Sequence, residues 1–279
     1  MIIIDNASTP PLNVDLSWCS SARIVREDRL GLVHARLRSF AESCGEILVF
    51  VDDDNVLDPE YLQRAHTALT CDDTLGAIGG RVIPRYEAEP PSWFATLGLD
   101  LACRDLGNLP LYAKWDRSSV ERRDYPVCAP IGAGLVIRRS AYADYVVAAR
   151  SDEARTTLGR KGSSLASGED NDMVMILLAA GWRVAYLPEL RLEHLIPARR
   201  LTSSYLAEYA YSTNLTWVQV LDLHGLRPWG AIDPWTAPLR KAKAYATFRA
   251  WRDDANFIRW RAACGLLDGR ARLEQSRPR

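Results

Sequence analysis

Short apolar, β-branched runs alternate with helical patterns along most of this chain, and that alternation limits the folds open to it. Each run is bounded by turn residues or by a helical pattern, as the strands of a layered sheet are. The strand-like runs are MIIID (1–5), EILVFVDDD (46–54), GAIGGRVIP (76–84), PIGAGLVI (130–137) and RVAYLPE (183–189). Strands that alternate with helices predict an α/β fold with a largely parallel sheet flanked by helices.

Helix boundaries are marked by their usual capping residues. The pattern over 30–43 predicts one helix, and Asp58 followed by Pro59 predicts the start of the next, as N-cap and first helical residue. A third, strongly apolar helix is expected to end at Gly181. Residues 85–125 are rich in proline, tryptophan and charge, and we expect a long functional loop there.

The composition is that of a globular protein with an ample core. Of the 279 residues, 48% are hydrophobic and 25% are charged. The six cysteines form no C-x-x-C pair, so neither a zinc site nor a disulfide framework is expected. The first residues lack a basic flank, and no apolar stretch reaches the roughly eighteen residues of a membrane span. We therefore expect a cytoplasmic protein.

Charge is balanced overall but unevenly distributed. Residues 240–279 contain eleven Lys and Arg against four Asp and Glu, although the net charge of the chain is zero. A helical segment over 240–273 that carries Trp251, Phe257, Ile258 and Trp260 among arginines is typical of interfacial helices, and predicts peripheral contact with an anionic membrane. The alternative is a helix that packs on the rest of the protein. No nucleic-acid partner is expected.

Three consecutive carboxylates, Asp52, Asp53 and Asp54, follow the strongest of the buried strands. In open α/β sheets, ligands bind beyond the carboxyl ends of strands. Adjacent carboxylates repel one another, and a cation on them relieves that cost. Mg²⁺ usually takes one or two carboxylates together with substrate phosphates, so a metal–phosphate site is one interpretation. A solvated acidic turn is the other.

Four segments occur in an order that resembles family 2 glycosyltransferases with the GT-A fold. They are IIIDNAS, GLVHARLRSFAESCGEILVF, VDDDNVLDPEYL with its D-x-D signature, and GEDND followed by an apolar helix, GWRVAYLPE and the histidine of LEHLIPARR. The resemblance covers residues 1–205 and implies a GT-A catalytic domain there. Residues 206–279 are then a helical C-terminal extension, to which no motif transfers.

The resemblance implies an inverting transferase that moves a sugar from a nucleotide diphosphate donor to a saccharide or lipid-linked acceptor with Mg²⁺ or Mn²⁺. The resemblance also implies roles for individual residues. Asp5 matches the carboxylate that binds the base, Asp52 and Asp53 match donor-binding residues, and Asp54 and His194 match metal ligands. Asp170 matches the catalytic base, with Glu169 beside it.

Each of these residues also has a structural interpretation. Asp5 can form an Asx-turn, and Glu169, Asp170 and Asp172 can be first-turn acids that favour the helix dipole. His194 can be a structural histidine.

Other candidates are weaker. Arg199 and Arg200 can clamp phosphate or be ordinary surface arginines. Gly132 and Gly134 allow a close backbone approach to a ligand, or relieve packing.

Two other functions remain open from the sequence. Nucleotidyl transfer also uses α/β sheets and acidic metal ligands, but it usually needs a Gly-rich basic loop after the first strand, where this chain has DNASTPP. A non-catalytic or truncated sugar-nucleotide-binding relative is the second alternative. Because Met1 leads directly into a strand, we also expect the first strand–helix unit of the fold to be lacking, which would leave a strand edge unpaired.

Overall fold

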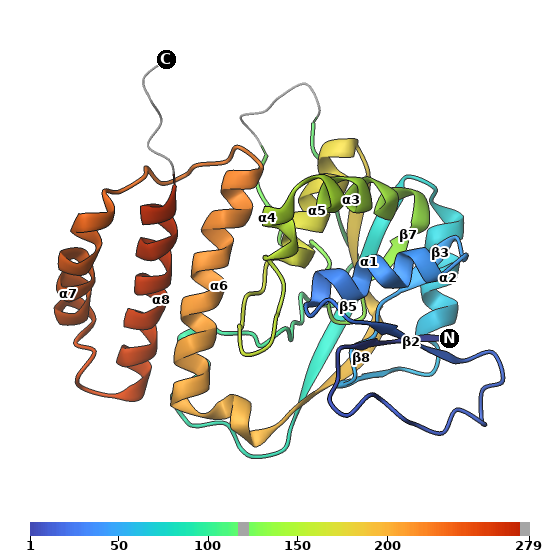
Figure 1. Ribbon diagram of the computed structural model, residues 1–279, viewed down its shortest axis with the longest axis horizontal. Helices are drawn as coiled ribbons and strands as arrows, with labels where there is room; N and C mark the ends of the chain where they lie inside the picture. Colours follow the sequence, from blue (N-terminus) through green and yellow to red (C-terminus); the bar gives the residue numbers. More distant parts are fainter. Residues whose placement is uncertain (117–122, 274–279) are drawn as a thin grey trace.

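The computed structural model describes residues 1–116 and 123–273, and its centre is a six-stranded sheet (Figure 1). The strand order is β3-β7-β5-β8-β4, and β6 pairs with the first part of β8. The strands are β3 (Ile47–Val49), β4 (Asn55–Leu57), β5 (Leu75–Tyr86), β6 (Leu111–Ala113), β7 (Val136–Arg138) and β8 (Arg183–Ile196). The long strands β5 and β8 form the middle of the sheet; β7 pairs with β5, β4 and β6 pair with β8, and β3 pairs with β7 at one edge.

The predicted α/β class is confirmed, but the sheet is mixed, so the prediction of a largely parallel sheet is wrong. Among the strands that the structure describes in this sheet, only β5 and β8 are paired in parallel; β7 is antiparallel to β3 and β5, and β8 is antiparallel to β4 and β6. A strand covered on both faces shows the same continuous apolar run in either direction. The sequence pattern therefore could not reveal the strand directions.

The first strand, β1 (Ile2–Asn6), lies outside this sheet. It pairs in parallel with β2 (Arg23–Glu27), and the two form a separate two-stranded sheet beside α1 (Leu32–Glu42). The three isoleucines of β1 are only half-buried, so the expected fully buried strand is a partly exposed one. The β2 strand was not predicted, because charged residues interrupt its apolar pattern.

Helices cover both faces of the sheet, with α1, α3 and α5 on one side and α2 on the other (Figure 1). Their bounds are α2 (Tyr61–Cys71), α3 (Arg139–Ser151), α4 (Glu153–Thr156) and α5 (Glu169–Ala180). The predicted cap of α2 is wrong: the helix begins at Tyr61, and Asp58 instead accepts a hydrogen bond from the backbone of Glu60 at 3.1 Å. Gly181 ends α5 in the left-handed conformation, as predicted (φ 96°).

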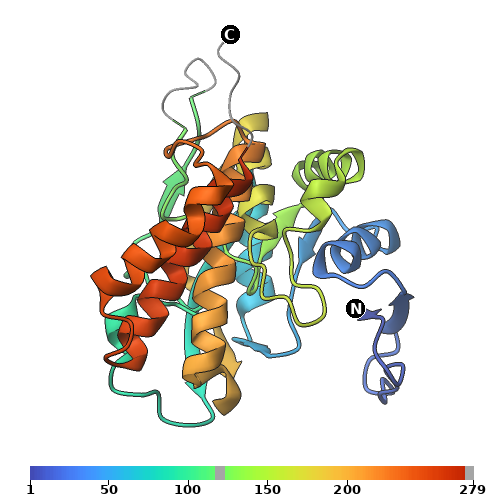
Figure 2. The same cartoon turned by 60° about the vertical axis from the view of Figure 1, so that its left-hand side comes forward.

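Three C-terminal helices stand beside the sheet (Figure 2). They are α6 (Ser203–Leu223), α7 (Ala237–Phe248) and α8 (Asp254–Arg272). Elsewhere the chain forms three short 3-10 turns among the described residues, η1 (Phe94–Leu97), η2 (Ala198–Leu201) and η3 (Pro234–Thr236). A Cβ on Gly265 would lie 2.1 Å from the carbonyl oxygen of Tyr211, so glycine lets α8 pack closely on α6. In the described part of the chain, no helix combines the length and apolarity needed to cross a membrane.

Candidate active site

A bulge in β8 places the candidate metal residues. The parallel register with β5 shifts between Gly79 and Arg81, and a Cβ on Gly80 would lie 1.8 Å from the carbonyl oxygen of Leu190. Glycine is therefore required at that close approach. Beyond the bulge, β8 pairs with β4 so that His194 lies opposite Asn55, next to the carboxylate triplet.

Asp54, His194 and Arg200 form one tight cluster at this edge. The Oδ2 atom of Asp54 lies 3.3 Å from Nε2 of His194 and 2.9 Å from a terminal guanidinium nitrogen of Arg200. The other terminal nitrogen of Arg200 lies 3.2 Å from the same Nε2. Although burial works against ionisation, His194 and Arg200 lower the pKa of Asp54, so its carboxylate is held ionised.

The two expected metal residues thus lie together, and their chemistry fits a divalent ion. Asp54 offers an ionised oxygen and His194 a ring nitrogen on one small surface. Among residues 1–116 and 123–273, however, no group of three or more His, Cys, Asp or Glu is placed to hold a metal. An ion here would take its remaining ligands from diphosphate oxygens and water, which is how Mg²⁺ is commonly held.

Asp52 belongs to a second, buried cluster around Arg36. The guanidinium of Arg36 is 4% exposed and lies 3.3 Å from a carboxylate oxygen of Glu169. Burial disfavours its charge, yet the nearby carboxylates of Glu169, Asp52 and Asp170 raise its pKa overall. One buried cation therefore faces the D-x-D segment and the start of α5 together.

Glu169 and Asp170 are adjacent in sequence but lie in different environments. Burial raises the pKa of Glu169 above its usual range, while Arg36 opposes the shift. Asp170 is less buried, and its two oxygens accept hydrogen bonds from the backbone N–H groups of Gly132 (2.8 Å) and Asn171 (2.9 Å). Asp170 is thus oriented by fixed donors at a helix N-terminus, whereas Glu169 is enclosed beside Arg36.

The absence of a side chain at Gly132 allows Arg36 and Asp170 to pack closely against its backbone. A Cβ there would lie 2.8 Å from a guanidinium nitrogen of Arg36 and 3.5 Å from Asp170. Gly134 has a φ of 69°, and a Cβ on it would lie 2.2 Å from Leu192. Both glycines therefore serve the close approach of protein groups, which was the structural alternative offered by the sequence.

The other predicted donor residues are placed differently. The Asp5 carboxylate accepts the backbone N–H groups of Ser8 (3.0 Å) and Leu12 (3.2 Å) and an Arg26 nitrogen (2.7 Å). The contact with Ser8, followed by those with Leu12 and Arg26, lowers its pKa to about 2 against the effect of burial. Asp5 thus makes the turn-type contact that was its structural alternative to base binding, and Asp53 is exposed at the D-x-D turn.

Sequence reasoning missed Arg36 and the buried contacts of Asp172, which it treated only as a first-turn acid. Arg36 falls in a core-facing position between Val33 and Leu37 on α1, and an arginine at such a position was the available signal. Asp172 is fully buried, bonds to Arg155 and lies 2.7 Å from Nε2 of His224. That contact ties α5 to the end of α6, and no local pattern predicts it.

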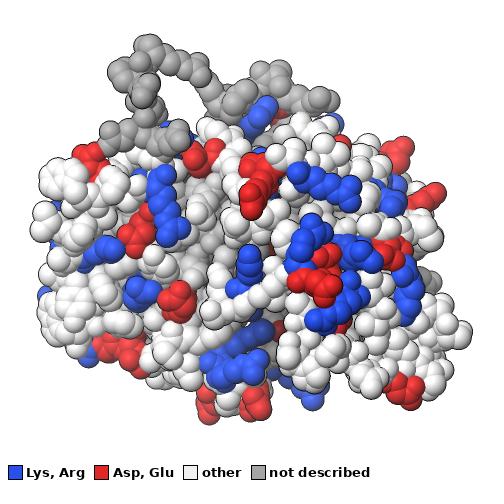
Figure 3. Space-filling view, in the orientation of Figure 1, with Lys and Arg blue, Asp and Glu red and all other residues white. Residues whose placement is uncertain are grey.

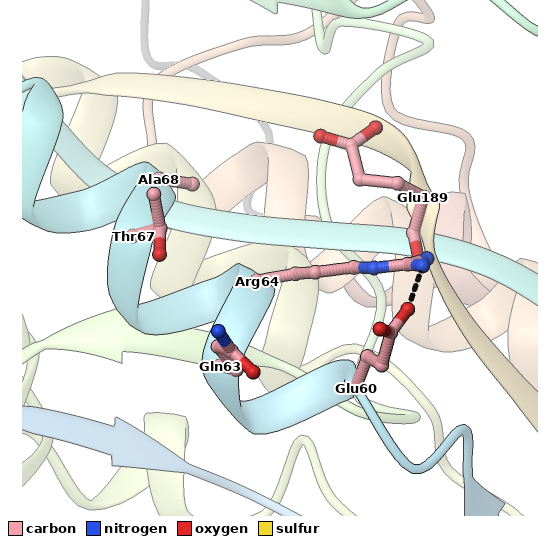
Figure 4. Close-up of a pocket in the computed structure, with 6 residues that line it drawn as sticks. All are labelled: Glu60, Gln63, Arg64, Thr67, Ala68 and Glu189. Carbon is pink, nitrogen blue, oxygen red and sulfur yellow. Dashed lines mark hydrogen bonds and ion pairs between the residues drawn. The ribbon is translucent and has the colours of Figure 1, made fainter.

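A separate surface pocket lies away from these clusters, between α2 and the bend of β8 (Figure 4). Its lining residues are Glu60, Gln63, Arg64, Thr67, Ala68 and Glu189. Arg64 forms an ion pair with Glu60, one turn away at the start of α2, and donates to the carbonyl of Glu189 on β8 at 2.8 Å. None of the predicted site residues lines this pocket.

The sequence of this chain matches a known protein family over most of its length. Residues 20–218 match the family described as glycosyltransferase like family 2, which is well over half of the chain. The protein belongs to that family, and its α/β architecture with a central sheet flanked by helices is of the GT-A type.

Curated relatives are similar over part of their length. An N-acetylglucosaminyltransferase of Mesorhizobium japonicum is 26% identical over 60% of this chain and 36% of its own length. The succinoglycan biosynthesis protein ExoM of Rhizobium meliloti is 26% identical over 72% of this chain and 56% of its own. The chain thus spans between a third and little more than half of these relatives.

Solved structures show a partial likeness. GalNAc-T7, crystallised with UDP, GalNAc and Mn²⁺, aligns over 88% of this chain and 43% of its own, with a TM-score of 0.46 and 15% identity. The mannosyltransferase PcManGT of Pyrobaculum calidifontis, in complex with GDP-Man and Mn²⁺, aligns over 87% of this chain and 56% of its own, with a TM-score of 0.44 and 19% identity.

Proposed function

We propose that this chain is an inverting, metal-dependent glycosyltransferase that uses a nucleotide diphosphate sugar, with Asp170 as the base that takes the acceptor proton. The observation that carries the proposal is the division of carboxylates between two neighbouring clusters. Asp54 with His194 forms one, and Asp170 with Glu169 forms the other, while Asp52 and Arg36 lie between them. Family membership supports the same reaction class.

The residues divide the chemistry between them. When bound on Asp54 and His194, Mg²⁺ or Mn²⁺ would offset the charge of the departing diphosphate. Asp170 accepts a proton from the attacking hydroxyl, and its two backbone donors fix the direction of the free lone pairs. The positive charge of Arg36 compensates the negative charges of Asp52 and Glu169 away from solvent, and this holds the D-x-D segment beside α5. Attack in a single displacement inverts the anomeric carbon.

The reaction class is tested with a panel of nucleotide sugars. The protein is incubated with UDP-, GDP- and dTDP-sugars and Mn²⁺, and release of the nucleoside diphosphate is followed with and without saccharide and lipid-linked acceptors. We expect acceptor-stimulated release from one donor class. Release of pyrophosphate from a nucleoside triphosphate and a sugar phosphate would indicate nucleotidyl transfer instead, and absence of both would indicate a non-catalytic relative.

Asp54 is proposed as the metal ligand because its ionised oxygen faces His194. We expect Asp54→Asn to lower the Mn²⁺-supported affinity for the nucleoside diphosphate by about a hundredfold, since a charged ligand is lost. Titration calorimetry with and without Mn²⁺ measures it, and exposed Asp53→Asn is the control with a smaller effect. Unchanged Mn²⁺-supported binding by Asp54→Asn would place the metal elsewhere.

The segment predicted to contact a membrane, residues 240–273, includes most of α7 and all of α8, and we propose the contact for α7 alone. Of the four apolar residues expected to face lipid, only Trp251 is exposed (62%), whereas Ile258 is buried (1%) in the interface with α6. The exposed apolar residues of this region instead include Trp235 (74%), in η3 just before α7, and Leu239 (70%) in the first turn of α7. On the left-hand side of Figure 3, where Figure 1 places α7, broad areas of uncharged surface lie between the charged side chains.

Basic charge accompanies that surface. The α7 helix has no acidic residue and carries Arg240 and Lys243, both exposed, whereas Lys241 is ion-paired with Asp268 of α8 at 3.0 Å. We propose that α7 lies on an anionic membrane, where apolar insertion and basic charge act together.

Flotation with vesicles tests the membrane proposal. We expect the protein to float with vesicles of one part phosphatidylglycerol to two parts phosphatidylcholine at low salt, and Trp235→Ala with Leu239→Ala to weaken binding about tenfold. Trp18→Ala removes an equally exposed tryptophan (72%) from the other end of the chain and is the control. No flotation of the unmodified protein, or an equal loss in the control, would rule out the proposed surface.

A further inference from the structure

One guanidinium contacts both atoms that the proposed metal site offers. Arg200 contacts Oδ2 of Asp54 at 2.9 Å and lies 3.2 Å from Nε2 of His194. These two atoms lie 3.3 Å from each other. The Arg200 side chain is only 16% exposed, so the contact is enclosed and is weakly screened by solvent.

The Arg200 backbone is fixed while its side chain reaches into the site. Arg200 lies in η2, and its N–H donates to the carbonyl of Pro197 at 2.8 Å. The following residue, Leu201, is buried (5%) and anchors the turn in the core. Release of the Asp54 contact therefore requires rotation of the Arg200 side chain and no rearrangement of the sheet.

We propose that Arg200 is a resident counter-ion that competes with the divalent metal for Asp54 and His194. A guanidinium only donates hydrogen bonds, so each lone pair that it uses is unavailable to a metal. Metal binding must therefore displace Arg200, and a diphosphate that arrives with the metal offers the released guanidinium a new anionic partner. The metal then binds weakly alone and more strongly together with the donor. This inference rests on the proposed metal site at Asp54.

Mn²⁺ binding in the absence of any nucleotide tests the competition. Free Mn²⁺ is measured by electron paramagnetic resonance during titration of the whole chain. We expect Arg200→Gln to bind Mn²⁺ about tenfold more tightly than the unmodified protein, because the competing charge is gone. Arg200→Lys keeps the charge and should show a smaller gain. Arg199→Gln, which removes the exposed neighbouring arginine, is the matched control and should leave the affinity unchanged.

The outcomes separate this inference from the proposed metal site. If Asp54→Asn abolishes the Mn²⁺ binding gained in Arg200→Gln, both stand. If Arg200→Gln binds Mn²⁺ no better than the unmodified protein, or less well, the competition is overturned, whatever Asp54→Asn does. If Arg200→Gln gains affinity but Asp54→Asn in that background does not remove it, the ion binds elsewhere, and both the metal site and the competition fail. Thermal melts of each variant confirm that the chain is folded.

Discussion

Asp170→Asn is expected to reduce glycosyl transfer by about 10²–10⁴-fold, because that is the usual contribution of a positioned general base. Donor binding should change little, since the loss falls on the transition state. The asparagine carbonyl can still accept the hydrogen bond that Gly132 donates to Asp170 at 2.8 Å, and only the one from Asn171 at 2.9 Å is lost, so the fold should be retained. Single-turnover transfer and calorimetric donor binding measure the two effects separately.

Glu169→Gln is the comparison for that experiment. Glu169 lies beside Arg36 in a buried position, and Asp170 is the more accessible carboxylate. We therefore expect Glu169→Gln to retain more transfer activity than Asp170→Asn and to act mainly through stability. An active Asp170→Asn enzyme together with an inactive but folded Glu169→Gln enzyme would assign the base to Glu169.

Arg36→Met is expected to destabilise the protein by about 3–5 kcal/mol, because removal of one partner leaves buried carboxylates uncompensated. Glu169 and Asp52 both lose the nearby cation that opposes the effect of burial on their pKa values. For a chain of this size, each kcal/mol lowers the melting temperature by about 2–4 °C. Thermal unfolding at neutral pH measures the loss.

Arg38→Met is the matched control, because Arg38 pairs with Glu42 at 2.9 Å on the same helix but with 42% of its side chain exposed. An exposed pair of this kind contributes about 0–1 kcal/mol. An equal loss of stability in both variants would contradict the role given to Arg36.

The pH dependence gives a second check on Arg36. The folded-state pKa of Glu169 lies above its ordinary value of 4.5, so the protonated carboxyl favours the folded state. Its contribution to stability is therefore fully present below the ordinary value and is lost as the pH rises through the folded-state pKa. Removing Arg36 raises that pKa further. The deficit of Arg36→Met should accordingly be largest near neutral pH and shrink as the pH falls towards the ordinary value.

Local sequence determined the class of fold and most of the segments that carry the candidate site. Apolar runs and helix caps depend on near neighbours, so β5, α5 and the D-x-D turn were predictable from short windows. The ordered motifs also pointed to the family that residues 20–218 match. The assigned roles of Asp54 and Asp170 remain proposals, although each lies in a cluster suited to its role.

The tertiary structure alone decided which side chains meet. Strand direction is not encoded in an apolar run, so the mixed sheet could not be predicted. Arg36 reaches Glu169 across more than a hundred residues of sequence, and Arg200 reaches Asp54 from a separate turn. Helix α8 contains apolar residues suited to lipid, but packing against α6 buries Ile258 and leaves the exposed apolar surface at the start of α7. A local pattern specifies that a residue must be covered, whereas the path of the chain determines what covers it.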